Sequence, residues 1–174
     1  MKLHVSEILP TLFFFCATSV FAQVSVVQTP GGGIQPRAAV DAAGVVHLVY
    51  FTGEPRGGDL RYVRSSDGAK SFDAALPVNR RAASAMAVGN IRGAQIAVGR
   101  KARVHVAWNG VGAKEAEPSP MLYTRLDDSA KSFEAERDVI EVHHGLDGGG
   151  AVAADGAGNV YVVWHAPGDG GKGE

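Results

Sequence analysis

The octet Ser65-Ser66-Asp67-Gly68-Ala69-Lys70-Ser71-Phe72 decides the fold, because residues 126–133, Leu126-Asp127-Asp128-Ser129-Ala130-Lys131-Ser132-Phe133, repeat it. Each octet follows a short strand-like run, LRYVR over 60–64 and MLYTR over 121–125. A tyrosine, an arginine, an aspartate, an Ala-Lys-Ser and a phenylalanine therefore recur in the same order and at the same spacing. The chain contains an internal repeat.

Each octet predicts a tight turn between two strands. Asp67 and the flanking hydroxyls can hydrogen-bond with backbone groups of the turn, and Gly68 can take a positive φ without a steric penalty. The phenylalanine at the end of each octet would begin the next strand as a core anchor. The residues predicted to be structural in this way are Ser65, Asp67, Gly68, Phe72, Asp128 and Phe133.

Short strands recur around the octets at intervals of about 60 residues. The segments VHLVY (46–50), VHVAW (104–108) and VYVVW (160–164) align as the second strand of three successive units. The first two units each add two further strands around their octet. With 23 glycines and no sustained helical period, the sequence predicts an all-β fold of four-stranded antiparallel units.

The octets resemble the Asp-box of the sialidase and BNR-repeat β-propeller family, whose pattern runs Ser-x-Asp-x-Gly-x-Thr-Trp. The match is carried by Ser65, Asp67, Ser71 and Phe72 in the first octet and by Asp128, Ser132 and Phe133 in the second. In both octets an alanine stands where the family prefers glycine. The resemblance implies a partial β-propeller of about two and a half four-stranded blades, over about 31–82, 90–142 and, incomplete, 148–174.

That incomplete third blade suggests that the chain is the amino-terminal part of a longer protein. A ring closed by assembly with other copies of the chain is the alternative. Within the blades, Tyr50, Trp108 and Trp164 occupy the same position of the repeat and are expected to be core aromatics, with a sugar-stacking platform as the alternative.

The amino terminus predicts a signal peptide over residues 1–22. Lys2 and His4 precede the apolar run ILPTLFFFCATSVFA, and Val20-Phe21-Ala22 offers small residues at a signal peptidase site. A hydrophobic first strand and a membrane anchor are the alternatives; a lipoprotein anchor is disfavoured because phenylalanines precede Cys16. Cleavage after Ala22 would leave a secreted or periplasmic mature chain, 23–174, with no membrane association.

Composition narrows the classes of partner and cofactor. The formal net charge of -1 and the 45% hydrophobic content suit a soluble globular unit and do not favour nucleic acid or an anionic bilayer as partner. The single cysteine would leave with the signal peptide, so neither a disulfide nor a thiolate metal site is expected. Glu141 with His143 and His144 could bind a divalent ion, but no third fixed ligand is evident, and we predict no metal and no cofactor.

The resemblance also implies a function. It implies an exported, glycan-directed protein that acts as an exo-glycosidase of the exo-α-sialidase type when full length; a non-catalytic propeller that binds extracellular carbohydrate or protein is the alternative. Sialidases clamp the substrate carboxylate with three arginines and use a tyrosine nucleophile with carboxylate partners. Carried over to this chain, Arg37 and Arg92 are the candidate substrate-binding residues and Asp59 is the candidate catalytic residue. The set is incomplete, so this chain alone is expected to be inactive.

Overall fold

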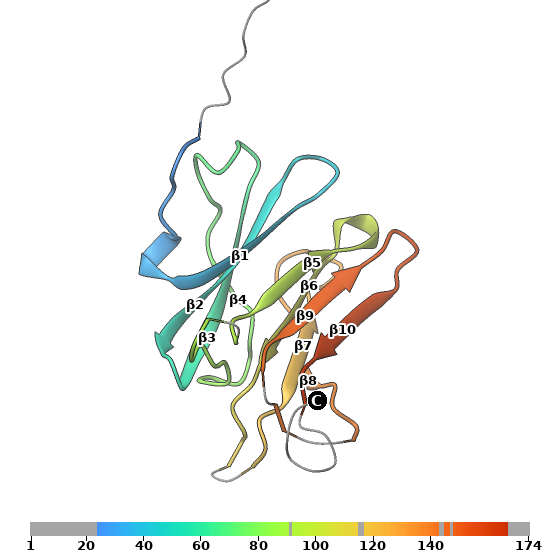
Figure 1. Ribbon diagram of the computed structural model, residues 1–174. Helices are drawn as coiled ribbons and strands as arrows, with labels where there is room; N and C mark the ends of the chain where they lie inside the picture. The colour runs from blue at the N-terminus through green and yellow to red at the C-terminus, as the bar shows by residue number, and fades with distance from the viewer. Residues whose placement is uncertain (1–23, 91, 115–116, 143–144, 147, 167–174) are drawn as a thin grey trace, which may run out of the picture.

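The computed structural model describes residues 24–90, 92–114, 117–142, 145–146 and 148–166, and within them the chain is all-β (Figure 1). The predicted signal peptide and Cys16 lie outside the described residues. Two short 3-10 turns, η1 (Pro30–Gly32) and η2 (Arg100–Ala102), accompany the strands. The strands are β1 (Ile34–Val40), β2 (Val46–Glu54), β3 (Gly57–Ser65), β4 (Leu76–Pro77), β5 (Gln95–Val98), β6 (Val104–Asn109), β7 (Met121–Arg125), β8 (Arg137–Asp138), β9 (Gly150–Ala154) and β10 (Val160–Trp164).

The strands form three sheets, each built from strands consecutive in sequence. The first sheet has the order β1-β2-β3-β4, the second has the order β5-β6-β7-β8, and the third pairs β9 with β10. All pairs are antiparallel. The predicted four-stranded antiparallel unit is therefore confirmed for the first two repeats. The fourth strand of each is only two residues long.

The sequence VSVVQTP over 24–30 favours a short strand, but the structure shows none there. Val24 and Val26 are 88% and 93% exposed. The next residues, Pro30–Gly32, form η1 instead, with Gly31 at φ 64°. Pro30 lacks the N–H that a strand ladder needs, and the segment before it joins no sheet.

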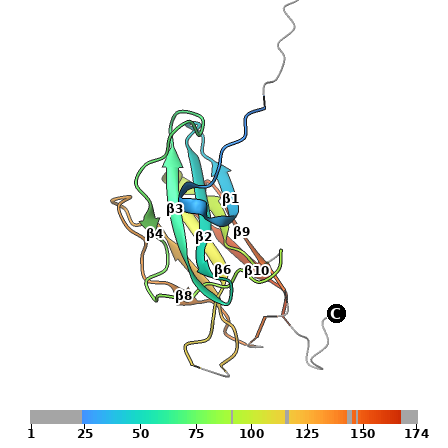
Figure 2. The ribbon, with the colours of Figure 1, turned by 90° about the vertical axis from the view of Figure 1, so that its left-hand side faces the viewer.

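The three sheets lie side by side and face to face (Figures 1 and 2). β1 contacts β5, and β5 and β6 contact β9, so successive sheets meet through their early strands. We call the contact between the first and second sheets the first interface, and that between the second and third sheets the second interface. Because the second sheet lies between two others, β6 is buried along its whole length.

The first interface holds the main hydrophobic core. Its buried side chains from the first sheet include Val49, Phe51, Leu60 and Tyr62, and those from the second include Val104, Val106, Trp108 and Phe133. In the second interface, Ala107, Met121 and Ile140 pack against Val152, Val162 and Trp164. The second and third sheets thus each present the valines and the aromatic residue of their second strand to the sheet before them.

The aromatic residues at the ends of the aligned second strands are packing residues in the first two sheets. Tyr50 and Trp108 are 4% and 1% exposed, which leaves no ring face for a sugar to stack on. Gly33 lies so close to the Tyr50 ring that an added Cβ would fall 2.1 Å from Cδ2. The core interpretation holds for these two positions.

A histidine and a tyrosine pair across the second and third strands of each complete sheet. His47 Nδ1 lies 2.6 Å from the Tyr62 hydroxyl, and His105 Nδ1 lies 2.8 Å from the Tyr123 hydroxyl. The rings are stacked in both pairs, with centroids 6.0 and 6.1 Å apart. Both histidines are 5% exposed, and these bonds give the Nδ1 atom of each ring a partner inside the sheet stack.

The two octet phenylalanines differ in burial, which yields a test of the sheet stack. Phe133 is 2% exposed and meets Tyr62 edge-on at 5.4 Å, whereas Phe72 is only partly buried. We expect Phe133→Ala to lower the free energy of unfolding by about 3–5 kcal/mol, as for other buried aromatic residues. Phe72→Ala is the matched control and should cost clearly less. Urea unfolding measures both, and equal losses would contradict the packing described here.

Candidate functional site

The first octet forms a turn organised by the Asp67 carboxylate. Ser65 Oγ donates to Asp67 Oδ1 at 2.7 Å, and Ser71 donates through its backbone N–H to Oδ1 at 3.0 Å and through its hydroxyl to Oδ2 at 2.6 Å. Gly68 and Ala69 have φ values of 74° and 65°. The predicted roles of Ser65, Asp67 and Gly68 match this turn.

The second octet uses a different aspartate from the predicted one. Asp127, not Asp128, accepts hydrogen bonds from the hydroxyls of Ser129 at 2.7 Å and Ser132 at 2.6 Å. Asp128 points outward with an 88% exposed side chain and pairs with Arg103. The reason is local: the second octet has Leu126 where the first has Ser65, so the hydroxyl that anchors the carboxylate is missing from that position, and the acceptor moves back by one residue.

Both turn carboxylates are held in their ionised form. Hydrogen bonds from Ser71 and Ser65 lower the pKa of Asp67, and those from Ser132 and Ser129 lower the pKa of Asp127. A carboxylate whose lone pairs are used in this way stabilises a turn and is poorly suited to move protons. The two octets are therefore structural elements of the chain.

Acid unfolding separates the two candidate aspartates of the second octet. A lowered pKa in the folded state stabilises the fold above the unfolded pKa, about 4, and this contribution is lost as the pH falls through the folded pKa. We expect Asp127→Asn to lower the Tm at neutral pH and to flatten the fall of Tm below about pH 4.

Asp128→Asn is the matched control, since it alters the neighbouring residue and removes only an exposed ion pair. Thermal unfolding followed by circular dichroism across the acid range measures both variants. A flattened acid limb in Asp128→Asn with an unchanged one in Asp127→Asn would restore the assignment made from the sequence.

Arg37 and Arg92 lie in neighbouring segments. Arg37 is exposed on β1, and Arg92 is partly buried before β5. The Gln35 amide donates to the carbonyl oxygens of Ala87 at 2.9 Å and Gly89 at 2.6 Å, which ties the start of β1 to the segment before Arg92. Gln35 has a φ of 49° at a register shift in β1, a joint that sequence analysis did not single out.

Asp59, the candidate catalytic residue, accepts hydrogen bonds that hold a loop in place. Its Oδ1 accepts from the side-chain amide of Asn79 at 2.8 Å and from the backbone N–H of Ala83 at 2.9 Å. Asp59 lies on β3, and β2 separates it from Arg37 on β1. These hydrogen bonds hold the connection from the first to the second sheet, and the arrangement does not unite Asp59 with Arg37 around one cavity.

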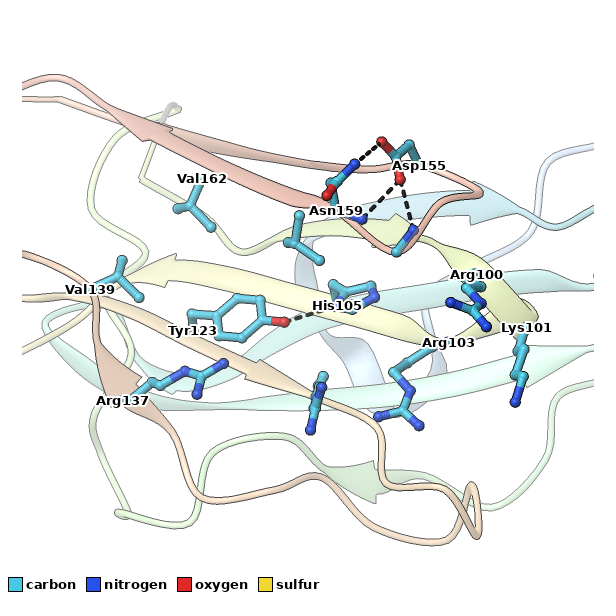
Figure 3. A pocket seen from close by; sticks show the side chains of 13 residues that line it. Arg100, Lys101, Arg103, His105, Tyr123, Arg137, Val139, Asp155, Asn159 and Val162 are labelled. Carbon is cyan, nitrogen blue, oxygen red and sulfur yellow. Dashed lines mark hydrogen bonds between the residues drawn. The ribbon is translucent and has the colours of Figure 1, made fainter.

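A cleft of about 500 Å³ between the second and third sheets is lined by several titratable side chains (Figure 3). Tyr123, Arg103 and Arg137 line it from the second sheet side, and Asp155 and Asn159 line it from the turn between β9 and β10. We call this cavity the basic cleft, because five cationic side chains line it. They are Arg100, Lys101, Arg103, Arg125 and Arg137.

Two of the cations of the basic cleft, Arg103 and Arg137, replace apolar residues of the first repeat, whereas Arg125 corresponds to Arg64. Arg137 pairs with Tyr123 in the sheet register where Leu76 pairs with Tyr62, and Arg103 occupies the turn position that Val45 has before β2. In the first interface the corresponding space is apolar and filled, with Phe133 on Tyr62. The positive charges of Arg103 and Arg137 thus have no counterpart at the same positions of the first repeat.

Ion pairs neutralise part of this charge. Arg103 pairs with Asp128, and Arg125 Nε lies 2.8 Å from Glu134 Oε1. The guanidinium of Arg137 lies 5.0 Å from the centroid of the Tyr123 ring, in a cation–π contact. For Arg100 and Lys101, which line the same cleft, no ion pair is present in the described part of the chain.

The titratable groups at the floor of the cleft are neutral. Burial lowers the pKa of His105, and the positive charges of Arg103 and Arg125 lower it further. Burial likewise raises the pKa of Tyr123. Hydrogen bonds from Asn159 lower the pKa of Asp155 and engage its carboxylate in the β9–β10 turn. The cleft therefore offers guanidinium donors above a neutral aromatic floor, an arrangement that suits an anion.

Sequence analysis missed the basic cleft, although part of its pattern is visible in one dimension. Arg103 and His105 alternate along one strand, and Tyr123 and Arg125 alternate along another, so each pair faces the same side of its sheet. Arg137 joins these residues only because β8 pairs with β7, which places Arg137 opposite Tyr123. Strand periodicity alone does not predict this register.

Among the residues that the structure describes, no group of three or more His, Cys, Asp or Glu side chains is arranged to hold a metal ion. His143 and His144 of the alternative metal site lie outside those residues. Within the same ranges no helix has the length and apolar character of a membrane span.

Comparison of the sequence with known proteins finds no matching family model and no matching curated protein. The resemblance to Asp-box propellers therefore remains an expectation based on the octets and the repeat.

Proposed function

We propose that this chain forms blades of an Asp-box β-propeller and serves, outside the cytoplasm, to bind an acidic glycan in the basic cleft. Two observations support the propeller part of the proposal. Four-stranded sheets of consecutive antiparallel strands stack face to face, and an aspartate-centred turn joins the third and fourth strands of each complete sheet.

The charge of the basic cleft carries the binding part of the proposal. Arginine guanidinium groups match the geometry of carboxylate and sulfate groups, and four of the five cationic side chains that line the cleft are arginines. A volume of about 500 Å³ lies within the usual range for small-molecule sites. A terminal acidic sugar fits these features better than a neutral one, because a neutral sugar would leave the guanidinium donors without an anionic partner.

Binding is supported better than hydrolysis. Glycosidases of the usual kinds need two free carboxyl groups, or a tyrosine with a carboxylate partner. In the basic cleft Asp155 is engaged by its turn, and Asp128 and Glu134, which lie beside it, are paired with arginines. The Tyr123 hydroxyl is hydrogen-bonded to His105, and no hydrogen bond joins it to a carboxylate in the described part of the chain.

Calorimetric titration with sialyllactose, and with lactose as the neutral control ligand, tests the binding site. We expect sialyllactose alone to bind. Arg137→Ala should weaken binding by at least about tenfold, since a hydrogen bond to a charged group contributes about 1.5–3 kcal/mol.

Arg37→Ala is the matched control, because it removes an arginine that the sequence favoured but that lies outside the cleft. Loss of binding in Arg37→Ala with full binding in Arg137→Ala would move the site to β1. Equal binding of lactose and sialyllactose would remove the role of charge.

A fluorogenic sialic-acid glycoside tests the catalytic alternative. We expect no release of fluorophore by the purified chain, because the described residues of the cleft lack a free carboxylate pair. Turnover that Asp59→Asn and Arg37→Ala both abolish would establish an exo-glycosidase and overturn a purely binding role.

A further inference from the structure

The turns that join the first two strands of each sheet are equal in length and differ in charge. They cover residues 41–45, 99–103 and 155–159. The first reads DAAGV and the third DGAGN, so each has one acid and no base. The second reads GRKAR and has three bases and no acid. The acid is lost and the bases are gained in the same turn.

In the first turn one carboxylate serves both the backbone and the buried histidine of the sheet. Asp41 Oδ1 accepts from the N–H groups of Ala43 and Val45, both at 2.9 Å, and Asp41 Oδ2 lies 3.2 Å from His47 Nε2. Asp155 Oδ1 holds the third turn through two backbone N–H groups, both at 2.8 Å. A carboxylate is therefore the usual partner of this turn in the repeat.

His105 of the second sheet has no such carboxylate. As in the first sheet, its Nδ1 accepts from a tyrosine hydroxyl, that of Tyr123 at 2.8 Å, which leaves the proton of the neutral ring on Nε2. This nitrogen points toward position 99, since a Cβ added to Gly99 would lie 3.0 Å from it. Across the described ranges no acceptor is hydrogen-bonded to His105 Nε2.

The cations of the second turn lie around this histidine in the basic cleft. Arg100, Lys101 and Arg103 line the same cleft as His105, and the turn between β9 and β10 lines its other side. In Figure 3 the Tyr123 side chain lies on one side of the His105 ring, and Arg100 and Arg103 lie on the other. An anion beside His105 Nε2 would therefore meet an N–H donor and positive charge together.

The second turn also has a backbone conformation that its sequence does not favour. Ala102 has a φ of 56°, whereas the same position holds Gly44 in the first turn and Gly158 in the third, at φ values of 81° and 102°. Glycine takes this left-handed conformation without penalty, and a residue with a Cβ does not. The residues of this turn are thus less suited to the turn itself than those of its two counterparts, as is common at binding sites.

We propose that the carboxylate of an acidic ligand lies beside His105 Nε2, in the position that the Asp41 carboxylate has beside His47 Nε2. The inference rests on the proposed binding of an acidic glycan in the basic cleft, and it makes His105 a binding residue that donates one hydrogen bond to the ligand. Arg100 and Lys101 supply the positive charge. The ligand thereby provides the acid that Gly99 does not.

NMR of the chain with isotopically labelled histidines tests this contact, with His47 as the internal control. We expect the Nε2–H proton of His47 to be protected from exchange with water and that of His105 to exchange faster. Addition of sialyllactose should slow the exchange at His105 and shift its Nε2–H signal downfield, toward that of His47. The His47 signal should not move, and lactose should change neither.

A carboxylate built into the chain gives a second test. Gly99→Asp places an acid beside His105, and Ala154→Gly removes the methyl group that would lie 2.9 Å from the new Cβ. We expect the combined variant to bind sialyllactose at least about tenfold more weakly in calorimetric titration, because its own carboxylate occupies the donor. Ala154→Gly alone is the matched control and should bind as the unaltered chain does.

The outcomes separate this inference from the proposed function. Sialyllactose binding that leaves the His105 signal unchanged would overturn the inference and leave the glycan site in place. Full binding by the folded Gly99→Asp, Ala154→Gly variant would do the same. If circular dichroism shows that this variant does not fold, the His105 signal decides. Absence of binding to the unaltered chain would overturn both proposals.

Discussion

The structure depends on sheets that are apolar on both faces. β6 is buried at every residue, with valines and a tryptophan toward one neighbour and a histidine, an alanine and an asparagine toward the other. A strand of this kind does not suit a two-layer sandwich. There each sheet has one face in water, and every second residue of its strands is polar. Such a strand as β6 requires a sheet on each side. The stack of three sheets is the simplest arrangement that meets this requirement for the second repeat.

The two buried histidines inside the stack are tolerated because each is paired with a tyrosine of its own sheet. In the first sheet the Asp41 carboxylate lies 3.2 Å from His47 Nε2, so that nitrogen carries the proton, and His47 Nδ1 accepts from the Tyr62 hydroxyl. Burial raises the pKa of Tyr62 to about 12, which keeps its hydroxyl available as a donor. In the second sheet Gly99 replaces Asp41, because a Cβ there would lie 2.9 Å from Ala154 of the third sheet.

The sequence allowed the sheets to be predicted better than the sites. Strand periodicity and the repeated octets are local properties, so the order and antiparallel pairing of β1 to β10 followed from them. Aligning the two octets by position predicted Asp128 as the acceptor of the second turn. The acceptor is Asp127 instead, because its carboxylate lies within hydrogen-bonding distance of the hydroxyls of Ser129 and Ser132. The basic cleft could not be predicted, since its residues meet only through register and sheet stacking.

Differences between repeats distinguish function from packing. Residues that agree between the first two units, such as the His–Tyr pairs, serve the stack, because both units face the same physical demands. Arg103 in place of Val45 and Arg137 in place of Leu76 are not demanded by the stack, because Leu76 packs against the core of the first interface and Val45 forms the same turn without a charge. Charge costs stability where an apolar contact was available. A group of such substitutions around one cavity therefore points to a ligand that needs positive charge, and an isolated surface arginine such as Arg37 does not.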